Sequence, residues 1–152
     1  WIRPLEGGPL EEAPALVLEA GRGVVGDHSF GRLRHVTIVF EDDWNAAARD
    51  VGHPVDPIGR RANVLVSGGG GARFVGSKLQ LGPAILEVKG ITSPCPVLEE
   101  AAPGMMQALR PEGRSGIWAR VLQGGTVQRQ DLLQALDRSA GNSASSESRP
   151  IE

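Results

Sequence analysis

The stretch "KLQLGPAILEVKG", residues 78–90, decides the fold class. Apolar side chains alternate with polar ones on both sides of the Gly82-Pro83 pair, and a period of two residues is typical of β-strands. A glycine-proline pair between two such runs indicates a tight turn. We therefore predict a β-hairpin whose two strands each bury one face. The residues on those faces are Leu79, Leu81, Leu86 and Val88.

Strand-like runs occur along most of the chain. They are "ALVLEA" at 15–20, "HVTIVF" at 35–40, "ANVLVS" at 62–67, and two or three short runs within residues 116–136. The chain contains 21 glycines and 11 prolines, which divide it into short pieces rich in Val, Ile and Leu. About eight short strands are expected, and this number favours a closed or nearly closed barrel. The predicted fold is mainly β.

Two short helical inserts are expected in this barrel. In "EDDWNAAARDVG", residues 41–52, Trp44, Ala47, Ala48 and Val51 share one helical face, and acidic residues begin the run. The second insert lies in residues 96–113, with a helical turn on each side of Pro103-Gly104. We expect Met105, Met106 and Leu109 to face the core. Residues 1–138 are then one domain, and the polar, unpatterned residues 139–152 are predicted to be a disordered tail.

The bulk composition argues against several classes of protein. The net charge is -2, from 16 basic and 18 acidic residues, and no dense basic block suggests nucleic-acid binding. A single cysteine cannot form an internal disulfide, and no run is apolar enough to suggest a membrane span or a signal peptide. We expect a cytoplasmic domain with a small-molecule partner.

Two glycine-rich stretches resemble nucleotide-binding motifs without their structural context. "GRGVVG", residues 21–26, has dinucleotide-binding spacing, but a loop and a strand follow it where that motif requires a helix. "GARFVGSK", residues 71–78, reverses the Lys-Ser order of a phosphate loop and precedes a strand. We reject both motifs and interpret these stretches as connecting loops.

Other familiar sites are also poorly supported. The three histidines and the cysteine do not stand at the paired spacings of a zinc site, and histidines in such settings are more often surface or capping residues. No G-x-S-x-G nucleophile elbow is present. A cysteine-histidine hydrolase would need a histidine that folding brings to Cys95, and the sequence leaves this alternative open.

Cys95 is the residue with the clearest chemical potential. It stands in "GITSPCPVLEE", residues 90–100, between Pro94 and Pro96. A lone cysteine is often a small buried hydrophobe. However, two prolines stiffen the turn, and a turn before a helix provides amide groups that lower the pKa of a thiol. The residues leave both interpretations open, and we favour a functional thiol.

The ordered motifs of the chain resemble those of the MOSC domain family, the domain named for the C-terminal part of molybdenum-cofactor sulfurases. The resemblance runs from Ile2 to about Leu136. It rests on these blocks in order: "GRGVVGDH", "RHVTIVFEDD", "DPIGRRANVLVSG", "LQLGPAILEVKGITSPCPVLEE" and "GIWARVLQGGTV". The sequence differs from the usual pattern at three positions. His35 and Gln130 resemble tolerated surface or loop changes, whereas Ala62 removes a carboxylate from the expected pocket.

The resemblance implies a barrel-like fold and a role in molybdenum or sulfur chemistry. Cys95 then binds the metal of a molybdenum cofactor (molybdopterin), or carries sulfur, and members that hold the metal reduce N-hydroxylated compounds. A separate reductase partner is implied. Arg61 and Asn63 are expected to bind the pterin phosphate or its amide edge, Thr92 and Ser93 to line the cysteine turn, and Arg120 to close the pocket.

The chemistry of these residues agrees with the implied roles. A thiolate is a soft ligand suited to a thiophilic metal or to sulfane sulfur. A guanidinium makes two-point contacts to phosphate, so Arg60, Arg61 and Arg120 are candidate anion clamps, although we favour a solvated strand end for Arg60. Asp27 and His28 follow the glycine loop, where Asp27 is equally a candidate for a turn-forming residue. The alternatives are a non-enzymatic sulfur-carrier or cofactor-binding module, and a barrel that only binds partners.

Overall fold

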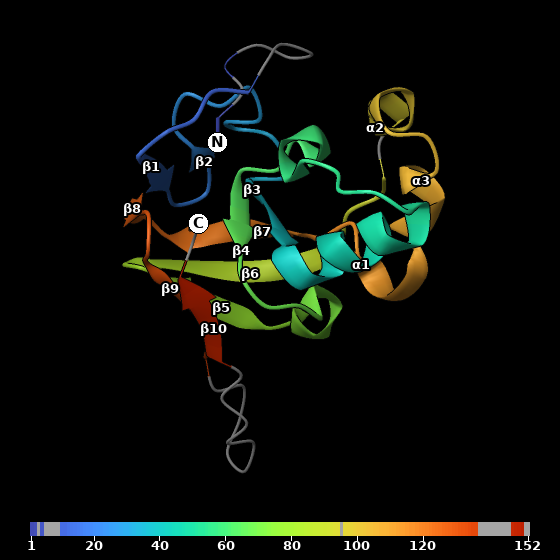
Figure 1. Ribbon diagram of the computed structural model, residues 1–152. Coiled ribbons are helices and arrows are strands. Elements are labelled where there is room, and N and C mark those ends of the chain that lie inside the picture. The colour runs from blue at the N-terminus through green and yellow to red at the C-terminus, as the bar shows by residue number, and fades with distance from the viewer. Residues whose placement is uncertain (3, 5–9, 95, 137–146, 151–152) are drawn as a thin grey trace.

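The computed structural model describes residues 1–2, 4, 10–94, 96–136 and 147–150. A seven-stranded sheet has the order β10-β9-β5-β6-β7-β3-β4, and a second sheet has the order β2-β1-β8. The two edge strands of the larger sheet, β10 and β4, approach each other, so the sheet curls into a nearly closed barrel (Figure 1). The prediction of a mainly β barrel with helical inserts is confirmed.

The strands are short, as expected from the density of glycine and proline. Their bounds are β1 Ala15–Glu19, β2 Gly23–Val24, β3 Val36–Phe40, β4 Val64–Val66, β5 Lys78–Leu81, β6 Ala84–Ile91, β7 Ile117–Gln123, β8 Gly125–Gln128, β9 Leu132–Ala135 and β10 Glu147–Pro150. β10 lies within the predicted polar tail, where it pairs with β9. The other residues of the predicted tail, 139–146 and 151–152, are outside the described residues, so their disorder stays a prediction.

The hairpin from which the fold was inferred is present. β5 and β6 pair antiparallel, with Leu79 opposite Leu86 and Leu81 opposite Ala84. Gly82 adopts a φ of 55°, which a residue without a Cβ adopts readily in a two-residue turn. Leu79, Leu81 and Leu86 are fully buried inside the barrel. The alternating leucines therefore determine which face of the hairpin forms the core.

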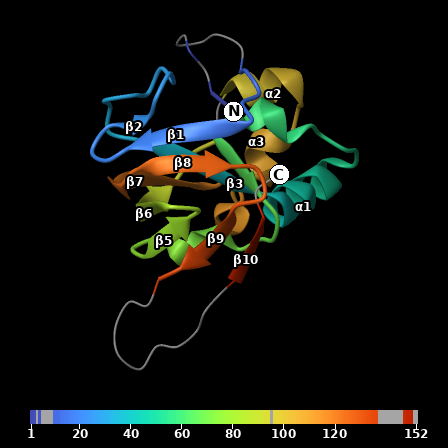
Figure 2. The same ribbon diagram turned by 90° about the vertical axis from the view of Figure 1, so that its left-hand side faces the viewer.

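Helices cover one side of the barrel, whereas the small sheet of β1, β2 and β8 lies at another (Figures 1 and 2). The helices are α1 Glu41–Val51, α2 Pro96–Ala101 and α3 Met105–Ala108, and the 3-10 turns are η1 Pro57–Arg60, η2 Gly71–Phe74 and η3 Pro111–Gly113. α1 connects β3 to the parallel strand β4. As expected, Met105 and Leu109 are buried, while Met106 is half-buried.

Strand β3 separates the two hydrophobic clusters of the molecule. Its residues Val36, Ile38 and Phe40 point into the barrel, and Val39 points toward the helices. On the helical side Trp44 of α1 is fully buried, and its indole nitrogen donates to the carbonyl of Val55 at 2.6 Å. Because both faces of β3 are covered, it forms a rigid base for the loops at its ends.

The glycine-rich stretch at residues 68–71 binds a side chain of the protein itself. The backbone N–H groups of Gly70 and Gly71 donate to the two carboxylate oxygens of Asp43, at 2.8 and 3.1 Å. A Cβ on Gly71 would lie 2.4 Å from the ring of Phe40, so this loop requires glycine for packing. The rejection of a phosphate loop here is consistent with this arrangement.

Candidate functional site

Six of the residues singled out from the sequence line one pocket of about 450 Å³. Its walls come from the loop after β2, from the segment between η1 and β4, and from the segment after β6. These segments are distant in sequence, and the curled sheet brings them to one end of β3. The six predicted residues are Asp27, His28, Arg61, Asn63, Thr92 and Ser93.

One wall is held by a side-chain network that we call the Asn63 brace, made of Asp27, Thr37 and Asn63. The Asn63 amide oxygen accepts from the N–H and hydroxyl of Thr37, at 3.0 and 3.2 Å. Its Nδ2 donates to Asp27 Oδ1 and to the carbonyl of Trp1, both at 3.3 Å. These four bonds occupy the full capacity of the amide. Asn63 therefore fixes β4, β3 and the Asp27 loop relative to one another.

Asp27 makes the hydrogen bonds of a turn-forming aspartate and also lies in the pocket wall, and its role toward a ligand stays a prediction. Its Oδ2 accepts from the N–H and hydroxyl of Ser29, at 3.1 and 2.5 Å, which is the bonding of a turn-forming aspartate. Its other oxygen accepts from Asn63, and the residue is 7% exposed in the pocket wall. The turn thus places Asp27 and the adjacent His28 at the pocket.

The pocket is rich in cations. Arg32, Arg34, Arg60 and Arg61 line it, and Asp27 is the carboxylate among the described lining residues. Arg34 lies over the ring of Trp118 at 5.5 Å, a cation–π distance that directs its guanidinium. The arrangement favours an anionic ligand, because guanidinium groups bind phosphate in a planar, two-point manner.

Arg61 has an unusual backbone. Its φ of 64° lies in the left-handed region, where non-glycine residues are uncommon, and its N–H donates to the carbonyl of Ile58 at 3.0 Å. Asp56 caps η1, and its side chain accepts from the N–H of Ile58 at 3.0 Å. The left-handed residue ends the 3-10 turn and directs the chain into β4.

Arg120 lies outside the lining of this pocket. It is half-buried on β7, and its guanidinium donates to the carbonyl of Leu33 at 3.0 Å. Leu33 itself lines the pocket. Arg120 thus contacts the loop that forms the pocket wall, and its predicted role in closing the pocket stays a prediction.

The interpretation of Arg60 as a solvated strand end is wrong. Arg60 is half-buried; its Nε donates to the carbonyl of Ser115 at 2.7 Å, and its Nη2 to the carbonyl of Ser93 at 3.3 Å. Ser115 was not singled out from the sequence, because a serine in a glycine-rich loop carries no signal of a partner 55 residues away. Only the closure of the barrel brings the two together.

Cys95 lies outside the described residues. On its N-terminal side Thr92 and Ser93 line the pocket, and on its C-terminal side α2 begins at Pro96, as predicted. Within the part of the chain that the structure describes, no group of three or more His, Cys, Asp or Glu side chains could hold a metal ion. The described residues also contain no helix with the length and apolarity needed to cross a membrane.

His35 is not the surface position inferred from the sequence. It is 1% exposed, and its Nδ1 accepts from the N–H of Val121 at 2.9 Å. Burial, followed by the nearby Arg120, lowers the pKa of His35. Gln130, in contrast, is exposed in a turn and has a φ of 73°, a conformation that glycine adopts more easily. Ala62 is buried under the helices.

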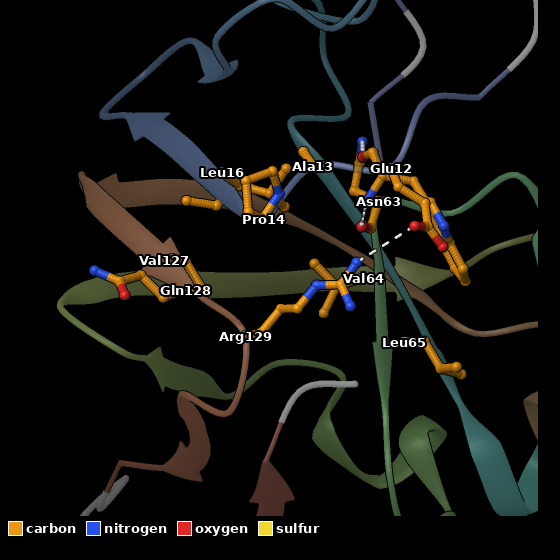
Figure 3. A pocket seen from close by; sticks show the side chains of 12 residues that line it. Glu12, Ala13, Pro14, Leu16, Asn63, Val64, Leu65, Val127, Gln128 and Arg129 are labelled. Carbon is orange, nitrogen blue, oxygen red and sulfur yellow. Dashed lines mark hydrogen bonds and ion pairs between the residues drawn. The ribbon is translucent and has the colours of Figure 1, made fainter.

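A smaller pocket of about 110 Å³ lies between the small sheet and β4 (Figure 3). Its apolar lining includes Leu16, Val64 and Val127, and at its rim Arg129 extends toward Glu12, with 3.6 Å between the charged atoms. Asn63 lines this pocket as well as the larger one. The other residues implied in chemistry line only the larger pocket or lie elsewhere, so we place the candidate site there.

Comparison with known proteins agrees with this geometry. The sequence model of the MOSC domain matches residues 25–134. The chain belongs to the MOSC domain family. This match covers most of the barrel and every described residue of the candidate site except Leu10. The search of curated proteins found no match.

Several solved structures are similar in fold to this chain. The YuaD protein from Bacillus subtilis is 25% identical, with a TM-score of 0.65, over 78% of this chain and 82% of that one. YiiM from Escherichia coli is 20% identical over 82% of this chain, with a TM-score of 0.64, and YiiM from Geobacillus stearothermophilus is 22% identical over 71%, with a TM-score of 0.60. The matches span 63% and 57% of the two YiiM chains. The likeness to YiiM shows the fold.

Proposed function

We propose that this MOSC domain binds a molybdenum cofactor, molybdopterin, in the larger pocket, and that it reduces N-hydroxylated compounds with Cys95 as the metal ligand. The observation that carries the proposal is the convergence of Asp27, His28, Arg61, Asn63, Thr92 and Ser93 on one cation-rich pocket. These residues come from three motifs that are distant in sequence. Their convergence supports a shared ligand.

The residues present fit the anionic part of such a cofactor. Arg61, Arg32 and Arg34 supply guanidinium groups to a phosphate, and Thr92 and Ser93 form the wall that leads to the cysteine. Because its amide is fully bonded within the protein, Asn63 orients the wall instead of contacting the pterin. Asp27 offers a carboxylate to the N–H groups of a pterin ring.

The bound group would supply two-electron redox chemistry at a metal that prefers thiolate ligands. Reduction of an N-hydroxylated compound to its amine and water consumes two electrons and two protons. We propose that a separate reductase supplies the electrons. The protein's own residues bind and orient the reactants.

The alternative is a non-enzymatic sulfur carrier, in which Cys95 holds a persulfide. This activity needs one nucleophilic thiolate beside a polar pocket, and a positive environment makes the thiolate form more accessible. The same arginines favour both candidates. The reductase and the sulfur carrier differ in what is bound to the purified protein, which is molybdenum in the first and a persulfide on Cys95 in the second.

Elemental analysis of the protein from a molybdenum-replete host tests the proposal. We expect molybdenum in stoichiometric amount, and its loss in the Cys95→Ala variant. If molybdenum is absent and mass spectrometry finds a persulfide on Cys95, the carrier is correct and the reductase is wrong. A protein with neither metal nor persulfide would overturn both.

Arg61→Gly separates the charge of Arg61 from its backbone conformation. Glycine adopts a φ of 64° without strain, so we expect unfolding stability within about 1 kcal/mol of wild type. Molybdenum content should nevertheless fall about tenfold, because one phosphate contact is lost. Arg61→Lys keeps the charge without the planar fork and should fall between the two. Wild-type molybdenum content in Arg61→Gly would contradict the assigned role.

A further inference from the structure

Thr92 and Ser115 bond reciprocally at the end of the β6–β7 pair. The Thr92 hydroxyl donates to the carbonyl of Ser115 at 2.8 Å, and the Ser115 hydroxyl donates to the carbonyl of Thr92. The N–H of Thr92 donates to the carbonyl of Gly116 at 2.9 Å, and both side chains are 3% exposed. This exchange prolongs the ladder beyond Ile91 and Ile117. It attaches the first residue after β6 firmly to the barrel.

Arg60 adds a second attachment from a different element. Its guanidinium spans the carbonyls of Ser115 and Ser93, which are 55 and 33 residues away in sequence. We call Arg60, Thr92, Ser93 and Ser115 the Arg60 clamp. The Ser115 carbonyl also accepts from Thr92, whereas Arg60 is the donor that the structure shows for the carbonyl of Ser93. Loss of the guanidinium therefore acts mainly on Ser93.

The position of Arg60 is itself fixed on both sides. Asp56 caps η1, the left-handed Arg61 ends it, and a Cβ on Gly59 would lie 3.3 Å from Leu98 of α2. The close approach at Gly59 holds η1 against α2. Because a guanidinium presents its N–H donors in a planar fork, its two carbonyl partners are held at a defined separation.

We infer that Arg60 is a positioning residue that sets the Thr92–Ser93 wall of the pocket through the Ser93 and Ser115 carbonyls. The consecutive arginines have separate tasks, since Arg60 holds the wall and Arg61 meets the ligand. The inference rests on the proposed function only in the identity of that ligand. Ser93 is two residues before Cys95, so a displaced wall also changes the environment of the thiol.

The pH dependence of Cys95 alkylation by iodoacetamide, measured on the folded protein, tests the inference. In Arg60→Ala we expect the midpoint of the alkylation profile to move by at least about 0.5 unit, because Ser93 loses its guanidinium partner and the chain two residues before Cys95 is no longer held in place. Arg60→Lys keeps the charge but cannot bridge two carbonyls in the same plane, so it should shift the midpoint nearly as much. A wild-type midpoint in Arg60→Lys would show that the charge alone acts and would overturn the positioning role. A general loss of stability would lower the melting temperature without moving this midpoint.

Arg73→Ala is the matched control. Arg73 also donates to two backbone carbonyls, those of Gly69 and Gly70, but it does not line the pocket. Its removal should leave the alkylation profile unchanged. An unchanged profile in Arg60→Ala, or an equal shift in Arg73→Ala, would overturn the inference.

Molybdenum content distinguishes the inference from the proposed function. If wild type binds molybdenum, Arg60→Ala should retain less of it than Arg73→Ala, by about fivefold or more. If wild type holds neither molybdenum nor persulfide while Arg60→Ala still shifts the alkylation midpoint, the proposed function is wrong and the positioning role stands.

Discussion

Two walls of the pocket, one held by the Asn63 brace and one by the Arg60 clamp, have hydrogen bonds of similar length but are attached to different parts of the fold. The Asn63 brace connects Thr37 of β3 and Asn63, next to β4, with Asp27 in the loop after β2. Two of its members, Asp27 and Asn63, are buried. The Arg60 clamp connects three loops and depends on a half-buried guanidinium. The brace is thus part of the barrel. In the clamp, Thr92 and Ser115 are buried at the barrel end, whereas Arg60 and Ser93 lie outside them.

This difference separates stability from function. Removal of a brace member leaves buried donors and acceptors unsatisfied, which costs free energy of folding. Removal of the Arg60 side chain exposes backbone carbonyls that water can reach, so the free energy of folding lost in Arg60→Ala is smaller. We therefore expect brace variants to unfold more easily and clamp variants to change the site.

The largest effect is expected where the clamp meets the barrel. Gly116 accepts from Thr92, has a φ of 106°, and a Cβ there would lie 2.4 Å from the carbonyl oxygen of Ile38. Gly116→Ala should cost roughly 4 kcal/mol or more in urea unfolding, since β3 cannot move away. Gly52→Ala is the control, because its φ is 100° with no atom within 4 Å, and it should cost only about 1–2 kcal/mol. Equal losses of unfolding free energy in the two variants would show that β3 can move away from a Cβ at residue 116.

A second pair of variants tests the comparison directly. Asn63→Ala removes four hydrogen bonds of a residue that is 8% exposed and should destabilise the protein by roughly 3 kcal/mol. Arg60→Ala should cost about 1 kcal/mol, because its partners become hydrated. Urea titrations of the two variants and wild type measure both values. A larger cost for Arg60→Ala would reverse the assignment of the two walls.

The fold could be predicted from the sequence because its signals are local. Alternation of apolar residues identified β3, β5, β6 and β7, and the spacing of Trp44, Ala47 and Ala48 identified α1. The pairing of the strands could not be predicted in the same way. The parallel pair of β3 and β4 and the separate small sheet depend on contacts between distant residues, which periodicity does not encode.

The candidate site was predictable to the extent that it follows ordered motifs. Six residues that the sequence motifs indicate lie in one pocket, whereas the interpretations of Arg60 and His35 are wrong. Both errors concern side chains whose partners, Ser115 and Val121, lie far along the chain. From sequence alone, a charged or polar residue next to a strand is predicted to be exposed to solvent, because its distant hydrogen-bond partner is not known.

The smallest expected effect is a dependence of stability on pH, and it arises from His35, which is buried in the barrel near the brace residue Thr37. His35 lies two residues before Thr37, and the N–H of Val121 donates to its Nδ1, so the neutral ring carries its proton on Nε2. That Nε2 is buried without a hydrogen-bond partner among the described residues. A second proton would have to occupy Nδ1 and would break the bond to Val121.

The sign of the pH effect follows from the lowered pKa of His35. Above a pH of about 6.5 the ring is neutral in both the folded and the unfolded chain, and its contribution to stability is fully present. As the pH falls below that value the unfolded chain takes up the proton first, so stability decreases by up to about 1.4 kcal/mol per pH unit until the folded ring also titrates. His35→Asn keeps an acceptor for Val121 and cannot titrate. Its urea midpoint should therefore depend less on pH between about 6.5 and 5 than that of wild type, and an equal dependence would show that His35 is not the titrating group.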